Sequence, residues 1–428
     1  MTCKPFTTET QRHREHQPSF LFYSVSLVKQ LAIRLRQATA PAKSLVMCLC
    51  GLIFFLTACG KEPFYQEQAY VFGTQVDVSI YGEDDAKARQ AVGSVMHEFQ
   101  RLHDLLHAWK PSELSELNAA IAQGKEKVVS AEVAAMLQDA ARMSAQSSGL
   151  FNPAIGGLIQ TWGFQADDFK PVLPDEKKIA SLLKANPQMD DLIFASEPNP
   201  SLPPLVRGGA DRAPLTAKGS LQSSGEPTGV LLAGAGGAGG VKVSSRNPVV
   251  KLDLGGYAKG YALDRAVAVL KQQGVHNALI NIGGNVLALG QHGSRAWRVG
   301  IQHPRKPGPL ATLELRDGEA IGTSGDYQRY FEFNGKRYCH LIDPRNGYPA
   351  QGTQAVTILT HGERAGLLSD GSSKPLFISG AQGWRAAARQ MQINEAMLID
   401  ADGVVHLTAD LQKRLEFTDK STLSKVEP

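Results

Sequence analysis

Apolar side chains in the first half of the chain follow two different spacings. Residues 76–81 alternate between apolar and polar side chains, which is typical of a half-buried β-strand. From Val92 to Leu106 the apolar side chains recur every three or four residues, which predicts one buried face of an amphipathic helix. A second helix is expected to begin after Ser130, because serine caps the first turn of helices well.

The second half of the chain repeats this mixture of helices and strands. The expected elements are a helix over 258–271 that ends near Gly274, a strand over 278–282 with a turn at 283–285, a helix over 381–391, and a hairpin with strands over 396–400 and 404–408. Strands and helices do not alternate regularly along the chain. The pattern therefore favours an α+β fold over a doubly wound parallel sheet.

Residues 196–240 differ from the rest of the chain in composition. They are rich in Pro, Gly, Ser and Ala and hold few large apolar side chains, which predicts a flexible surface insertion without a core of its own. Residues 234–239 match the GxGxxG pattern of dinucleotide-binding folds. However, a strand-like run that ends in proline follows them, where that fold needs the start of a helix, so we do not predict such a fold.

The N-terminal region has the features of an export signal. The uncharged apolar run 45–56 follows a basic segment and is short for a membrane span. Small residues then precede Cys59, and this arrangement resembles the lipobox of bacterial lipoproteins, in which the cysteine carries the lipid. The alternatives are an uncleaved membrane anchor or a buried strand with an incidental cysteine. We predict an inner-membrane lipoprotein facing the periplasm, with the outer membrane as the other possible location.

These features divide the 428 residues into four parts. The predicted parts are an export region over 1–58, a tether over 59–68, a catalytic domain over 69–411 that contains the insertion, and a C-terminal tail over 412–428. Beyond Cys59 the sequence holds a single further cysteine, Cys339, which argues against structural disulfides.

The charge distribution changes the meaning of the basic pI of about 8.7. The whole chain carries +4, but residues 1–44 alone carry +5, with seven basic and two acidic side chains, so the remainder is close to neutral at −1. A domain with that charge offers no general attraction for nucleic acid, which we exclude as a partner. An anionic ligand must instead be bound by a few well-placed groups.

Four polar clusters are candidates for such groups. The first, 253–264, reads as a short strand, a Gly-Gly turn and the start of a helix, with Lys259 in the first helical turn, where a phosphate would be stabilised. An ordinary solvent-exposed turn between a strand and a helix is the alternative. The second, 322–326, reads as a polar turn bounded by glycines.

The other two clusters lie further along the chain. Two prolines and an Asn-Gly pair predict a rigid, non-helical loop over 340–349, in which His340 is either a structural or a catalytic side chain. Residues 369–378, taken alone, read as a capped turn.

Taken together, the motifs resemble the ApbE flavin transferases. The stretches DLGGYAKGYALD, GTSGDYQRYFE and HLIDPRNGYP occur here in the order and spacing typical of that family, and the resemblance covers residues 69–411 apart from the insertion. Members of this family take FAD, release AMP and attach FMN through a phosphoester to a Thr or Ser of a target flavoprotein. The resemblance implies a T-fold-related α+β fold with mixed sheets, packed helices and one large catalytic unit.

The resemblance also implies roles for individual residues. His340 is the expected general base, which accepts the proton of the target hydroxyl. The residues expected to contact FAD are Phe72, Trp109, Leu150, Phe151, Asn152, Asp253, Lys259 and Ile342. The aromatic rings of Phe72 and Trp109 suit the flat ring systems of FAD. The expected protein partner is a target flavoprotein with an acceptor motif similar to Ser/Thr-Gly-Ala-Ser/Thr.

Family members bind Mg²⁺, and the resemblance places this site at Gly256, Asp370 and residue 374. The sequence departs from the family here, since Lys374 stands where a Thr is usual. An ammonium group cannot coordinate a metal, so Lys374 is expected to take over part of the cation's role at the FAD pyrophosphate. Asn152 and Asn285 also stand where the family often has Asp.

The leading hypothesis is a membrane-tethered FAD:protein FMN transferase. One alternative is a lipoprotein that binds FAD without chemistry. Another is an FAD pyrophosphatase, in which water attacks in place of the target hydroxyl.

Overall fold

The computed structural model describes residues 63–166, 171, 173–196 and 240–427. The predicted export region, Cys59 with its predicted lipid and nearly all of the insertion over 196–240 lie outside the described residues. Within the described part, no helix combines the length and the apolar character needed to cross a bilayer.

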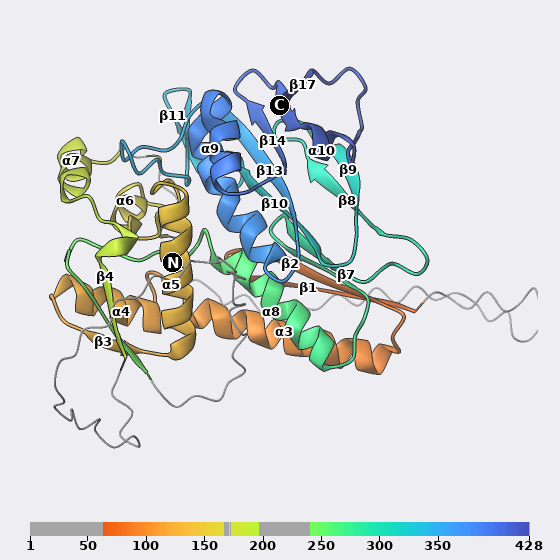
Figure 1. Cartoon of the computed structure of the whole chain (residues 1–428), viewed down its shortest axis with the longest axis horizontal. Helices are drawn as coiled ribbons and strands as arrows, with labels where there is room; N and C mark the ends of the chain where they lie inside the picture. The colour runs from red at the N-terminus through yellow and green to blue at the C-terminus, as the bar shows by residue number, and fades with distance from the viewer. Residues whose placement is uncertain (1–62, 167–170, 172, 197–239, 428) are drawn as a thin grey trace, which may run out of the picture. The chain divides into compact units, whose positions relative to one another are not determined.

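A nine-stranded sheet forms the centre of the described residues (Figure 1). In spatial order its strands are β1 (Phe64–Val71), β2 (Thr74–Tyr81), β6 (Ala278–Ile282), β7 (Asn285–Leu289), β10 (Glu319–Gly325), β13 (Thr353–His361), β14 (Glu395–Asp400), β15 (Val405–Thr408) and β17 (Ser424–Glu427). Neighbouring strands are antiparallel except β15 and β17, which are parallel.

Both faces of this sheet are covered. The helices α3 (Asp85–Leu105), α8 (Ala258–Gln272) and α9 (Ala365–Gln390) cover one face. A small sheet of β8 (Trp297–Gln302), β9 (Pro309–Leu315) and β16 (Glu416–Phe417) packs on the other. Each face of the sheet has its own hydrophobic core, and strand β13 contributes to both. Val356 and Ile358 pack toward the helices, while Ala355 and Leu359 pack toward the small sheet.

The remaining elements lie beside this layered core. They are α4 (Glu113–Ala122), α5 (Ala131–Gln146), α6 (Gly156–Thr161), α7 (Glu176–Ala185), the 3₁₀ turn η1 (Met189–Asp191), α10 (Ala409–Gln412), a sheet of β3 (Lys127–Val129), β5 (Val241–Ser245) and β4 (Leu192–Ser196), and a hairpin of β11 (Tyr330–Phe333) and β12 (Lys336–Cys339). The mixture of helices and largely antiparallel sheets confirms the predicted α+β class.

Several predicted elements are confirmed because local periodicity determines them. Strand β6 matches the predicted range, and the C-terminal hairpin forms between β14 and β15. Helix α5 begins after Ser130, whose hydroxyl accepts a hydrogen bond from the amide of Val133 at 3.3 Å.

Three of the candidate clusters have a different local structure from the one predicted. Residues 369–378 are helical within α9, and Gly380, at φ 65°, separates this part from the predicted helix over 381–391. Residues 322–325 belong to β10 and are not a turn. Residues 252–254 form no strand, although Lys251 makes a single bridge to Ile155. In each case long-range packing overrides weak local signals.

The predicted domain limits also need correction. Strand β1 begins at Phe64, inside the predicted tether, and pairs along its whole length with β2. The predicted tail contains β16, which pairs with β9, and β17, which adds to the central sheet beside β15. These tail strands are two and four residues long and mostly exposed, so they lack the apolar alternation by which strands are found in a sequence.

Candidate active site

A cavity of about 1030 Å³ lies at one end of the central sheet. Two tight turns meet there, Phe72-Gly73 between β1 and β2 and Gly283-Gly284 between β6 and β7. All four residues have positive φ, as two-residue hairpin turns of this type require. A Cβ atom on Gly283 would lie 2.6 Å from the hydroxyl oxygen of Thr74, so glycine is needed for the two turns to approach.

Aromatic rings form one side of the cavity. The ring of Phe72 lies edge-on to His103, with 5.8 Å between centroids, and His103 is 5.1 Å from His107. His107 in turn contacts Trp109, at 4.5 Å between ring centroids. Trp109 is 36% exposed, so it presents an aromatic face that a flat ligand ring can cover.

Asp253 lies on the cavity wall and is tied to two neighbours. Its Oδ1 accepts a hydrogen bond from the amide of Gly255 at 2.9 Å, and its Oδ2 accepts one from the side chain of Gln165 at 2.8 Å. The side-chain oxygen of Gln165 is buried and accepts no hydrogen bond from the described residues. This residue was missed by the sequence analysis, because nothing local links it to Asp253, 88 positions away.

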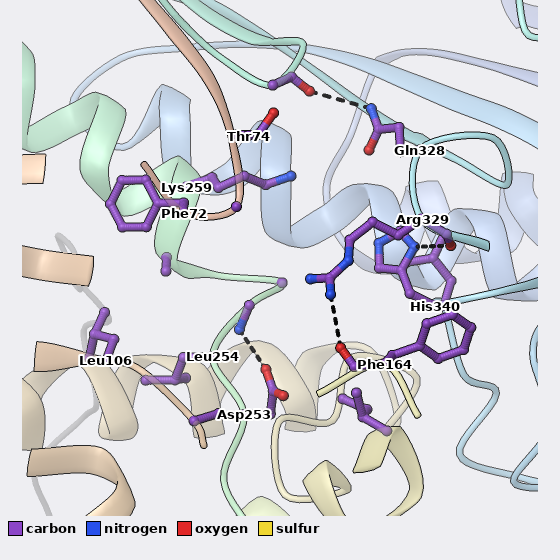
Figure 2. Close-up of a pocket in the computed structure, with 18 of the residues that line it drawn as sticks. Phe72, Thr74, Leu106, Phe164, Asp253, Leu254, Lys259, Gln328, Arg329 and His340 are labelled. Atoms are coloured by element: carbon purple, nitrogen blue, oxygen red, sulfur yellow. Dashed lines mark hydrogen bonds between the residues drawn. The ribbon is translucent and has the colours of Figure 1, made fainter. Parts of the chain in front are cut away.

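Lys259 and Arg329 extend into the cavity from opposite sides, with His340 beside Arg329 (Figure 2). The guanidinium group of Arg329 donates hydrogen bonds to the carbonyl oxygens of Phe164 at 2.9 Å and Ala166 at 3.3 Å. These contacts hold the cationic group in place at the cavity wall. Arg329 lies in the GTSGDYQRYFE motif, but it was not assigned a role there.

The environment of His340 determines which ring nitrogen carries the proton. The Nδ1 atom lies 3.2 Å from the carbonyl oxygen of Arg329, and because a carbonyl can only accept, Nδ1 is the donor. The Nε2 atom of the neutral ring therefore has a free lone pair. Burial, together with the positive charges of Lys259 and Arg329, lowers the pKa of His340 to about 3.

A buried ion pair between Asp370 and Lys374 lies next to this region. The two residues are one turn apart in α9, and their side chains are 1% and 12% exposed. The ammonium group of Lys374 donates to Oδ1 and to the backbone carbonyl of Asp370, the latter at 2.7 Å. Burial would raise the pKa of Asp370, but Lys374 and Lys259 lower it overall. Burial also lowers the pKa of Lys374, although Asp370 opposes this effect.

Other groups complete the hydrogen bonding of Asp370. Its Oδ2 accepts from the amide of Gly260 at 2.9 Å, and its Oδ1 accepts from the side chain of Asn285 at 3.2 Å. The carbonyl oxygen of the Asn285 side chain accepts from the amide of Thr323, at 3.1 Å. The carboxylate, which is carried by α9, is thus linked to three further elements, α8, β7 and β10, and these fix its position.

The structure brings most of the predicted site residues to one cavity. Those that line it are Phe72, Trp109, Leu150, Phe151, Asn152, Asp253, Gly256, Lys259, His340, Ile342 and Lys374. Asp370 lies directly behind Lys374. Asn152 is largely occupied in shaping its own loop, since its side chain bonds to the amide of Ala154 and the carbonyl of Pro187, both at 3.0 Å. Their assigned roles toward FAD and magnesium stay predictions.

The donor atoms around Asp370 do not fit the predicted magnesium ion. Magnesium requires oxygen ligands around it, whereas both carboxylate oxygens of Asp370 already accept hydrogen bonds from N–H groups. In the described part of the chain, no three His, Cys, Asp or Glu side chains are grouped so that they could bind a metal.

Comparison with known proteins agrees with this geometry. The model of the ApbE family matches residues 72–398. An FAD:protein FMN transferase of Rhodobacter capsulatus is 36% identical over 381 residues, which cover 89% of this chain and 63% of that relative. A second, from Treponema pallidum, is 29% identical over 391 residues, which cover 88% of this chain and 95% of the relative.

Solved structures show the same fold. The ApbE protein of Thermotoga maritima superimposes with a TM-score of 0.66 at 23% identity, covering 82% of this chain and 99% of its own. The flavin transferase ApbE of Vibrio cholerae gives a TM-score of 0.62 at 21% identity, with the same coverage. These similarities confirm the predicted ApbE-like architecture.

Proposed function

Because the chain belongs to the ApbE family, we propose that it is an FAD:protein FMN transferase. It attaches the FMN part of FAD to a Ser or Thr hydroxyl of a target flavoprotein and releases AMP. The observation that carries this proposal is the cavity, in which aromatic rings on one side adjoin cationic groups and a neutral histidine on the other. FAD has the matching parts, since its flat rings are joined by a diphosphate.

The aromatic side supports binding of a ring system. Phe72 is held by the hairpin turn and by Phe99, at 6.1 Å between ring centroids, so its ring is positioned before a ligand arrives. Trp109 presents a partly exposed ring at the same cavity. Stacking on such positioned rings adds about 0.5–1.5 kcal/mol beyond the burial of apolar area.

The cationic side supports binding of the diphosphate. Lys259 lies in the first turn of α8, where its charge adds to the partial positive charge of the helix N-terminus. Arg329 lies across the cavity from it. Gly255 is exposed and Gly256 is half-buried at the cavity, and neither carries a side chain, so a phosphate held between Lys259 and Arg329 can approach the backbone there.

The reaction we propose is an in-line displacement at the FMN phosphorus. The target hydroxyl oxygen forms a new bond to this phosphorus, while the bond from the phosphorus to the bridging oxygen breaks and AMP leaves with that oxygen. The hydroxyl proton passes to Nε2 of His340, whose lone pair is available because Nδ1 donates to Arg329.

Substrate binding itself improves His340 as a base. In the protein without ligand, the pKa of His340 is about 3, partly because of the cations around it. A bound diphosphate adds negative charge beside the same cations and raises this pKa toward the range useful at neutral pH. The base therefore becomes effective when FAD is in place.

The partners and location belong to this proposal as well. We propose that the target carries an acceptor motif similar to Ser/Thr-Gly-Ala-Ser/Thr, and that a lipid on Cys59 tethers the domain to the bacterial inner membrane, facing the periplasm. The sequence around residues 45–60 supports the tether. The magnesium ion expected from the family resemblance takes no part in this proposal, because the groups around Asp370 do not fit it.

One incubation distinguishes the three candidate functions. The purified chain is mixed with FAD and a carrier protein that displays the acceptor motif, and protein-bound flavin fluorescence and free AMP are both measured. Fluorescent carrier with an equal amount of AMP supports the transferase. AMP without labelled carrier identifies a pyrophosphatase, and bound FAD without either product identifies a binding protein.

A further inference from the structure

We propose that the ammonium group of Lys374 occupies the predicted metal position and donates a hydrogen bond to the diphosphate of the bound substrate, while Lys259 and Arg329 balance its charge, so that FAD binding and FMN transfer need no divalent metal. This inference rests on the proposed function, because it assumes that the cavity binds FAD. It starts from the disagreement between the predicted magnesium site and the groups that are actually present at Asp370.

The first support is the occupation of the carboxylate. Three N–H groups from Gly260, Asn285 and Lys374 bond to the side-chain oxygens of Asp370, and the residue is 1% exposed. A metal ion would have to displace the Lys374 ammonium from a buried contact. Such displacement would leave two cations close together in a region of low exposure, which is strongly unfavourable.

The second support is the space that the lysine chain occupies. A Cβ atom on Gly256 would lie 3.3 Å from Cε of Lys374, so the lysine chain runs directly against this glycine. Gly256 and residue 374 were both predicted as metal positions, and the lysine side chain fills the gap between them. The absence of a side chain at residue 256 is what makes room for it.

The third support is that Lys374 still reaches the ligand. Its side chain is 12% exposed and lines the cavity. Two of its three N–H donors are accounted for by Asp370, so among the described residues one remains to meet a ligand oxygen. The carboxylate thus holds the ammonium in position, and the lysine side chain lines the cavity.

Charge counting explains why further cations are needed. A magnesium ion bound to one carboxylate contributes +1 to its surroundings, whereas an ammonium bound to one carboxylate contributes zero. The two charges of the diphosphate must then be balanced by Lys259 and Arg329, which lie on opposite sides of the cavity. Lys374 contributes a directed N–H donor and local positive potential next to the phosphate.

The test measures FAD binding by quenching of flavin fluorescence, because this readout needs no acceptor protein. The full chain is titrated with FAD in EDTA and, separately, in millimolar Mg²⁺. We expect the two dissociation constants to agree within about twofold, since no site is left for the metal to fill. The Lys374→Thr variant should bind FAD about tenfold or more weakly in EDTA, because a charge-assisted hydrogen bond is lost, and Mg²⁺ should restore much of the affinity.

A matched control and a second variant keep the result interpretable. Lys413 forms a comparable pair with Asp410, three residues earlier, but it is 73% exposed and is not part of the cavity. Lys413→Thr should bind FAD like the unmodified chain in both buffers. If Lys374→Thr does not fold, the double variant Asp370→Asn with Lys374→Met removes both charges at once, and it should show weak FAD binding in both buffers.

The outcomes separate this inference from the proposed function. Tight binding of FAD that requires Mg²⁺ in the unmodified chain overturns the inference and leaves the transferase proposal intact. Unchanged affinity of Lys374→Thr in EDTA also overturns the inference. No binding of FAD in either buffer overturns the proposed function together with the inference.

Discussion

Two histidines in this protein have opposite electrostatic environments. His340 borders the cavity, next to the cations Lys259 and Arg329, and its pKa is lowered by burial and by these charges. His406 lies on β15 between two carboxylates, with Nε2 at 2.8 Å from Asp400 and Nδ1 at 2.6 Å from Glu427. Burial lowers the pKa of His406, but the two carboxylates raise it overall.

The difference shows how one residue type serves two purposes. A histidine among cations stays neutral and keeps a lone pair, as a general base requires. A histidine between carboxylates is stabilised as a cation, and here it connects the end of β14 to β17 through their side chains. The charges around each histidine determine whether its ring is neutral or cationic, and so which role it can serve.

The largest expected effect comes from removing the base. His340→Gly should lower the rate of FMN transfer about 10²- to 10⁴-fold, the usual contribution of a general base. FAD binding, measured by fluorescence quenching, should persist. His406→Gln is the control and should transfer FMN at the unmodified rate. Loss of FAD binding in His340→Gly would make His340 a binding residue instead.

The next effect is a shift in the pKa of His340 on ligand binding. Adding ADP, which carries the diphosphate without the flavin, should raise this pKa by about one unit or more, because a negative charge within a few ångströms stabilises the imidazolium. The pKa is followed by NMR of the histidine ring protons, with His340→Gly used to assign the signal. An unchanged pKa at saturating ADP would contradict the position assigned to the diphosphate.

Removing the second histidine should lower stability and leave catalysis intact. His406→Gln should reduce the free energy of unfolding at pH 6 by about 1–2 kcal/mol, since two hydrogen bonds to carboxylates are weakened. Denaturant titration measures this change. A loss of about tenfold or more in the rate of FMN transfer by His406→Gln would contradict this prediction, because it would show that the region around His406 is coupled to the cavity.

The contribution of His406 to the free energy of unfolding should depend on pH. Because the folded-state pKa of His406 is raised, its contribution is fully present below the unfolded value of about 6.5 and is lost as pH rises through the folded-state value. The difference in stability between the unmodified chain and His406→Gln should therefore shrink from pH 6 to pH 9. His340 acts in the opposite sense, since its neutral form is favoured by folding and protonation below about pH 6.5 favours unfolding.

The parts of the fold that sequence analysis predicted well are set by local patterns. The alternation of residues 278–282 and the cap at Ser130 need only neighbouring residues, and both are found as expected. The helix that carries Asp370 was missed because Gly371, Ser372 and Pro375 are poor helix formers. It forms because this segment is buried between α8 and the central sheet.

The sequence predicted only those site residues that belong to recognisable motifs. The motifs identified Lys259, His340 and Asp370, and the structure places Lys259 and His340 on one cavity, with Asp370 directly behind Lys374. The Gln165 contact to Asp253 and the carbonyl contacts of Arg329 join residues 88 or more positions apart. Such contacts depend on the folded chain, and no spacing in the sequence signals them.

The most direct test of the central claim is mass spectrometry of the acceptor protein after incubation with FAD and this chain. The account predicts that the acceptor gains the mass of one FMN less one water on a single Ser or Thr, with one AMP released for each acceptor modified, and that His340→Gly forms both products at least about 10²-fold more slowly. An acceptor of unchanged mass, with FAD converted to free FMN and AMP, would contradict it.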